Sequence, residues 1–137
     1  MAALTAHEAL IHVMVIAASA DAKVSDRELE IISRLVNRSP VFETFDHSNL
    51  GQVAAQAIDL IKDSSNLDKV LGMVLEGVPS RLHDTAYALA VEVASVDLRL
   101  EQEELRFLEM IRDGLNLDGL VAAAIETSAR ARLRRAD

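Results

Sequence analysis

The chain has 137 residues, half of them apolar, which fits one domain of ordinary size with a hydrophobic core. It contains no cysteine and only seven Gly and Pro residues, which excludes disulfide scaffolds, thiolate metal sites and turn-rich β folds. The formal charge is −8, and residues 1–125 are more acidic still, because four Arg lie in residues 126–137. An acidic body repels a phosphate backbone, so we expect no nucleic-acid binding by it.

The first ten residues, MAALTAHEAL, carry no Lys or Arg and so lack the charged start of a signal peptide. Thr5 followed by Glu8 predicts a capping box that opens a helix running to about residue 20. The apolar stretch of residues 13–20 is much shorter than the roughly 20 residues that span a membrane. We therefore expect a buried helix, no transmembrane segment and a cytoplasmic protein.

Ser25 and Glu28 predict a second capping box, and the helix that follows ends at Pro40. Its inward face is formed by Leu29, Ile32, Leu35 and Val36. Further helices are expected over residues 49–63, 67–77, from a cap at Ser80 to about 96, over 102–115, and from 118 into a tail, 130–137, that can fray. The pattern predicts an all-α fold: a single domain over 1–137 formed by a compact bundle of about seven helices.

A sequence repeat at an offset of 76 residues is the most informative feature. Residues 10–37 and 86–113 share the pattern D-x-[KR]-[VL]-x-x-x-E, which aligns Asp21 with Asp97 and Glu28 with Glu104. Each copy reads as an apolar helix, a short loop opened by Asp and an amphipathic helix with Glu in its first turn. We therefore expect an internal two-fold helix–loop–helix repeat whose two copies superpose.

Structural roles alone account for this motif. The Asp can accept bonds from backbone donors in the loop, and the Glu favours a helix N-terminus through capping and the helix dipole. Such contributions are worth roughly 0.3–1 kcal/mol each. In this interpretation the four acids are helix caps and loop anchors.

The paired motif resembles that of the tellurite-resistance TerB-like family, small helical domains in which Asp-Gly is followed by an apolar residue and then by Glu at the next helix start. Ala22 and Leu98 stand where that motif has Gly. The resemblance implies a non-enzymatic, bacterial tellurite or chemical-stress-response module whose partners are other stress-response proteins. It also implies an acidic surface suited to metal binding.

A divalent cation is therefore the alternative interpretation of the acids. If the two loops pack side by side, Asp21, Glu28, Asp97 and Glu104 offer carboxylate oxygens suited to Ca²⁺ or Mg²⁺. Neither loop matches an EF-hand, and no other cofactor is indicated. The second alternative is a protein-interaction or assembly domain without metal, with a homo-oligomer as one form.

No sequence motif indicates catalysis. There is no Gly-rich phosphate loop, no G-x-S-x-G and no Glu-x-x-His pair, so we expect no enzyme. Glu92 interrupts a nearly apolar helix where its repeat counterpart is Ile16, so it must be paired, protonated or on a wet edge. The tail residues Arg130, Arg132, Arg134 and Arg135 either complement a helix C-terminus or form a small anion-binding patch.

Overall fold

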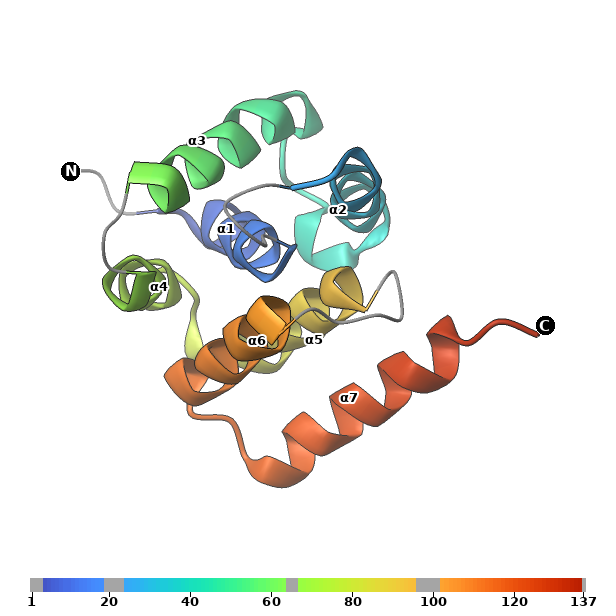
Figure 1. The fold of residues 1–137 in the computed structure, drawn as a ribbon. Coiled ribbons are helices and arrows are strands. Elements are labelled where there is room, and N and C mark those ends of the chain that lie inside the picture. The colour runs from blue at the N-terminus through green and yellow to red at the C-terminus, as the bar shows by residue number, and fades with distance from the viewer. Residues whose placement is uncertain (1–3, 19–23, 64–66, 96–101, 137) are drawn as a thin grey trace.

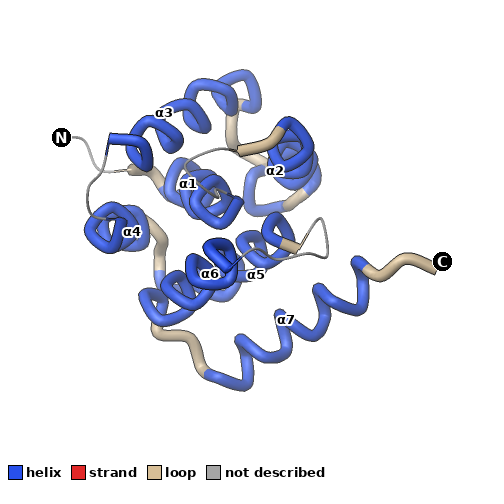
Figure 2. The backbone as a smooth tube through the Cα atoms, in the orientation of Figure 1, coloured by secondary structure: helices blue, strands red, loops and turns tan. Residues whose placement is uncertain are grey.

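The computed structural model describes residues 4–18, 24–63, 67–95 and 102–136, with the side chains of 102–105 excepted. Across these ranges the chain forms seven α-helices and no strand, which confirms the predicted all-α fold (Figures 1 and 2). The helices are α1 (Ala6–Ala18), α2 (Asp26–Arg38), α3 (Leu50–Asp63), α4 (Leu67–Glu76), α5 (His83–Ala94), α6 (Gln102–Leu115) and α7 (Gly119–Leu133). In this part of the chain, every helix is too short or too polar to cross a membrane.

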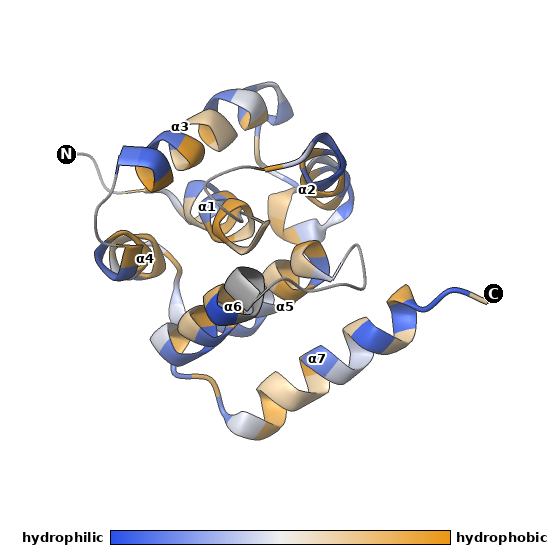
Figure 3. Ribbon diagram, in the orientation of Figure 1, coloured by the Kyte–Doolittle hydropathy of each residue, from blue (hydrophilic) through white to orange (hydrophobic). Residues whose placement is uncertain are grey.

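Helix α1 lies at the centre of the molecule. Every residue from Ala9 to Ala18 is buried, and α1 packs against α2, α3, α4, α5 and α6. A helix that is apolar on all sides must be surrounded by other elements, because no side of it can face water without cost. In Figure 3 the apolar surfaces of the neighbouring helices turn toward this centre.

Both predicted capping boxes are confirmed. The Thr5 amide donates to Glu8 Oε1 over 2.9 Å, and the Glu8 amide donates to Thr5 Oγ1 over 3.1 Å. The Ser25 and Glu28 pair repeats this exchange at 3.0 and 3.1 Å. Each box satisfies two backbone donors that the first turn of a helix leaves unpaired.

The predicted cap at Ser80 is wrong. Pro79 is followed by a short 3₁₀ turn, η3 (Ser80–Leu82), and α5 begins only at His83, without a side-chain cap. The Leu82 amide donates to the Pro79 carbonyl over 2.8 Å, so the tight turn itself satisfies the amide that a cap would serve. Two similar turns, η1 (Pro40–Phe42) and η2 (His47–Asn49), lie between α2 and α3.

Helix α2 turns a narrower face inward than its sequence pattern predicts. Ile32 and Val36 are buried, whereas Leu29 and Leu35 are only half-buried. Leu105 of α6 aligns with Leu29 at the 76-residue offset, and its side chain lies outside the described set. The α2 stripe therefore rests chiefly on Ile32 and Val36.

The helix boundaries follow the offset of the sequence repeat. Shifted by 76 residues, the bounds of α1 become 82–94 and those of α2 become 102–114, against 83–94 for α5 and 102–115 for α6. In both units the second helix packs against the first. Superposition of residues 10–37 on 86–113 remains a prediction.

Candidate functional site

The four predicted metal ligands are only partly within the described structure. Glu28 accepts the backbone N–H of Ser25, as a capping residue does. Glu104 lies in the first turn of α6, but its side chain is outside the described set, and Asp21 and Asp97 lie outside the described residues altogether. Within the described ranges, no three His, Asp or Glu side chains are grouped so that they could hold a metal ion.

A different polar site lies at the corner between α6 and α7. Helix α6 ends because Asn116 adopts a left-handed conformation, with φ of 52°, and the Leu117 amide donates back to the Arg112 carbonyl over 3.4 Å. Asp118 then caps α7 by accepting the Leu120 amide over 2.7 Å. Only three residues separate the two helices, so their adjoining ends enclose a crevice.

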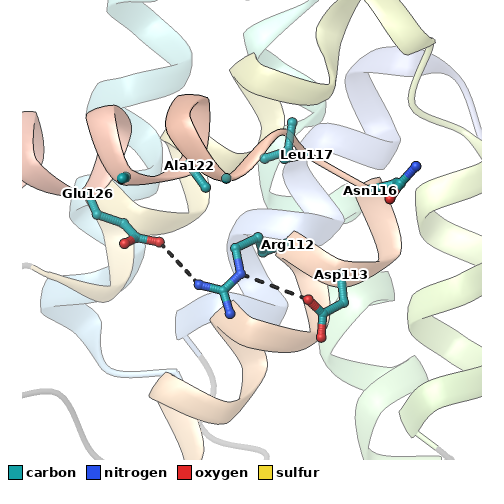
Figure 4. A pocket seen from close by; sticks show the side chains of 8 residues that line it. Arg112, Asp113, Asn116, Leu117, Ala122 and Glu126 are labelled. Carbon is teal, nitrogen blue, oxygen red and sulfur yellow. Dashed lines mark ion pairs between the residues drawn. The ribbon is translucent and has the colours of Figure 1, made fainter.

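This α6–α7 crevice has a volume of about 440 Å³ (Figure 4). Arg112 projects into it between two carboxylates: one guanidinium nitrogen lies 3.6 Å from Glu126, and Nε lies 3.9 Å from Asp113. The crevice is lined by Arg112, Asp113, Asn116, Leu117, Gly119, Ala122, Ala123 and Glu126.

Tyr87 joins this charge cluster from α5. Its hydroxyl donates to Glu126 Oε2 over 2.6 Å, a short distance typical of a hydrogen bond to a charged acceptor. Burial, followed by the hydrogen bond to Glu126, raises the pKa of Tyr87 well above its ordinary value. The phenol therefore stays protonated and remains a donor.

Tyr87, Glu126 and Arg112 together form what we name the α7 clamp. They come from α5, α7 and α6, so the hydrogen bond and the ion pair join three helices. This arrangement fixes α7 in place.

A second contact holds the C-terminal half of α7. Arg132 forms an ion pair with Glu92 of α5: its Nη1 atom lies 2.7 Å from one carboxylate oxygen of Glu92 and 2.8 Å from the other. The Glu92 side chain is only 18% exposed, so this acid is both paired and largely shielded from water. The presence of Glu92 in the largely apolar helix α5 is therefore explained by its ion pair with Arg132 of α7.

Helix α7 contacts the body through two buried alanines and the partly buried Ile125, and leaves two larger apolar residues outside. Ala122 and Ala129 are its buried residues, while Leu120 is 80% exposed and Val121 40% exposed. In the described ranges, these two are the large apolar side chains that face water most fully. In Figure 1 α7 lies at the edge of the molecule, beyond α5 and α6.

An apolar groove runs along α5 beside α7. It consists of two hollows of about 380 and 390 Å³ that share Thr85 and Ala88. Val121, Ala124 and Ile125 of α7 line the first hollow, and the Glu92–Arg132 pair lies in the second. Small side chains on both helices leave this space unfilled.

The sequence pointed to only part of this site. Glu92 stood out as an acid in an apolar helix, and its pairing matches one of the interpretations left open above. Tyr87 and Arg112 were missed, although the repeat contains a signal: their counterparts at the 76-residue offset are Ile11 and Val36, both fully apolar. A polar residue aligned with an apolar one indicates a polar neighbour in one helix pair only.

Searches of protein-family models, curated proteins and solved structures found no match. The fold and the site geometry therefore carry the functional argument.

Proposed function

We propose that this chain is a non-enzymatic protein-interaction domain that presents α7 to a partner. The observation that carries the proposal is the exposure of Leu120 and Val121 on a helix attached to the body through two alanines, the partly buried Ile125 and polar contacts. Single exposed apolar side chains are ordinary, but two adjacent ones beside an apolar groove are typical of an interaction site.

The proposal is tested by photo-crosslinking from α7. Because the chain has no cysteine, Ala124→Cys places one thiol-linked crosslinker on the outward side of α7. Ala55→Cys, at an exposed alanine of α3, is the matched control. We expect discrete adducts from the α7 position that disappear when Leu120→Glu is added. Equal adducts from both positions, or none from α7, would contradict the proposal.

The second candidate is a cation-binding, TerB-like stress-response module. It is supported by the helix boundaries, which recur at the offset that aligns Asp21 with Asp97 and Glu28 with Glu104. If a cation binds only the folded state, it stabilises that state by about 2.7 kcal/mol at a hundredfold excess over its dissociation constant. Engagement of Glu28 in a capping box favours the interaction domain over this candidate.

Glu28→Gln separates the two candidates, because Gln can still serve a capping box but carries no charge. Calorimetry with Ca²⁺, Mg²⁺ and Mn²⁺ on the wild type and this variant measures the difference. For an interaction domain we expect no binding heat and an unchanged melting temperature. Binding heat at millimolar cation that Glu28→Gln abolishes would establish the cation module instead.

A further inference from the structure

The side of α7 that faces away from the body is uncharged along its whole length. Leu120, Ala124, Thr127 and Ala131 fall within about 60° of one another on a helix of 100° per residue, opposite the buried Ala122 and Ala129. All four are exposed. We name these four residues the outer face of α7.

The spacing of this face is the same when read in either direction. The four residues are separated by four, three and four positions, which is the spacing of the core seam in paired helices. A two-fold axis midway between Ile125 and Glu126 would place Leu120 opposite Ala131 of a second copy. It would likewise place Ala124 opposite Thr127, so that a larger side chain meets a smaller one at each step.

The charges at the two ends of α7 have opposite signs. Asp118 is exposed at the N-terminus, and only one of its carboxylate oxygens, Oδ1, has a bonding partner in the described part of the chain. Arg134 and Arg135 are exposed beyond the C-terminus of α7, and the described residues provide neither with an ion pair. In an antiparallel pair each Asp118 would lie beside the Arg134 of the other copy, at both ends at once.

Resting on the proposed function, we propose that the partner of α7 is a second copy of this chain. The two copies pair antiparallel through their outer faces, with Leu120 in the apolar contact and Asp118 beside Arg134. A two-fold pairing uses the same surface on both copies, so the match between the two ends of one helix is what such an interface requires. The contact is small, which predicts a weak and reversible dimer.

The first test is sedimentation equilibrium of the full chain from about 10 µM to about 1 mM, the range in which small interfaces associate. We expect a monomer–dimer equilibrium that Leu120→Glu shifts at least tenfold toward monomer. Ala55→Glu adds the same charge on α3 and should leave the equilibrium unchanged. Both positions are exposed, so far-ultraviolet dichroism should remain that of the wild type.

The second test fixes the register by exchanging charges. Asp118→Arg alone and Arg134→Glu alone each bring like charges together at both ends, so each should dimerise less than the wild type. An equimolar mixture should recover dimer, because a heterodimer pairs opposite charges at both ends. High salt should weaken this recovery.

A monomeric wild type at about 1 mM would overturn the dimer. So would a dimer indifferent to Leu120→Glu, and a mixture no more dimeric than the separate variants would overturn the antiparallel register. Photo-crosslinking distinguishes these failures from failure of the proposed function, because a monomeric chain can still give adducts from α7 with a different protein.

Discussion

The two helix pairs that the 76-residue sequence offset aligns, α1–α2 and α5–α6, differ in what packs against them. In α1–α2, positions 11, 16 and 36 are Ile, Ile and Val, all buried in the core. At the corresponding positions of α5–α6 lie Tyr87, Glu92 and Arg112, which contact α7 through hydrogen bonds or ion pairs. The α1–α2 pair is therefore packed by apolar side chains at these positions, whereas the α5–α6 pair makes polar contacts with α7. Two helix pairs with the same local sequence pattern thus differ in their surroundings: α1 lies in the core, while α5 and α6 hold α7 at the edge of the molecule.

Apolar packing and polar contacts stabilise a helix in different ways. Burial of apolar surface stabilises a contact without favouring one orientation of the side chains. Hydrogen bonds and ion pairs require a particular geometry and contribute only a modest net free energy. Helix α7 fully buries only Ala122 and Ala129, with Ile125 partly buried against the core, so polar contacts supply much of what positions it. We therefore expect α7 to be the less stable part of the fold.

The largest effect is expected in the apolar pair. Ile11→Ala empties a fully buried site in the central helix, so the free energy of unfolding should fall by about 2–5 kcal/mol in urea denaturation. Leu29→Ala, at a half-buried position of α2, is the control and should cost less. Equal losses at both positions would show that α1 is not the centre of stability.

A smaller, local effect is expected in the α7 clamp. Glu126→Ala leaves the buried Tyr87 hydroxyl without its acceptor, which should cost about 1–3 kcal/mol. Hydrogen exchange should quicken in α7 more than in α1, because the clamp holds α7 alone. Tyr87→Phe removes the donor instead and should cost about 0.5–1.5 kcal/mol. Uniform acceleration in both helices would count against a local clamp.

His12 provides a pH test confined to the first half, since its repeat counterpart is Ala88. The side chain is buried, its Nδ1 lies 2.8 Å from the Glu8 carbonyl oxygen, and burial lowers the pKa of His12 below its ordinary 6.5. Below pH 6.5 the unfolded chain takes up a proton that the folded chain refuses, so stability is lost as the pH falls.

Relative to His12→Leu, the wild type should therefore lose stability between about pH 7 and pH 5.5, by at most about 1.4 kcal/mol per pH unit. Denaturant titrations of both proteins across this range measure the difference, and the other ionisable groups cancel because both proteins share them. A difference that stays constant with pH would mean that His12 titrates alike in both states.

The smallest effect is expected at the second α7 contact. Glu92→Gln keeps the shape of the side chain and removes its charge, and because Arg132 is 54% exposed the pair should be worth less than about 1 kcal/mol. A double-mutant cycle with Arg132→Gln measures the coupling. A coupling above that of the Tyr87–Glu126 pair would make Glu92, and not the clamp, the main anchor of α7.

Much of the fold could be predicted from local sequence. The capping boxes at Thr5 and Ser25 gave two helix starts, because a cap depends on residues three positions apart. Ser80 failed as a cap because a proline-led 3₁₀ turn occupied its place. Of the predicted acidic site, Glu28 acts as a cap, while Asp21, Asp97 and the Glu104 side chain lie outside what the structure describes, so the cation site remains a hypothesis.

Local sequence was enough to predict the helical class, the helix starts at the Thr5 and Ser25 caps and the buried character of α1, because these follow from short-range periodicity and capping. The contact among Tyr87, Arg112 and Glu126 could not be predicted from sequence, since these residues come from three helices and lie up to 39 residues apart. The tertiary structure also determines which side of α7 faces water. The periodicity of α7 is weak, because alanines lie on every side, and only the position of α5 selects Ala122 and Ala129 for burial and leaves Leu120 outside.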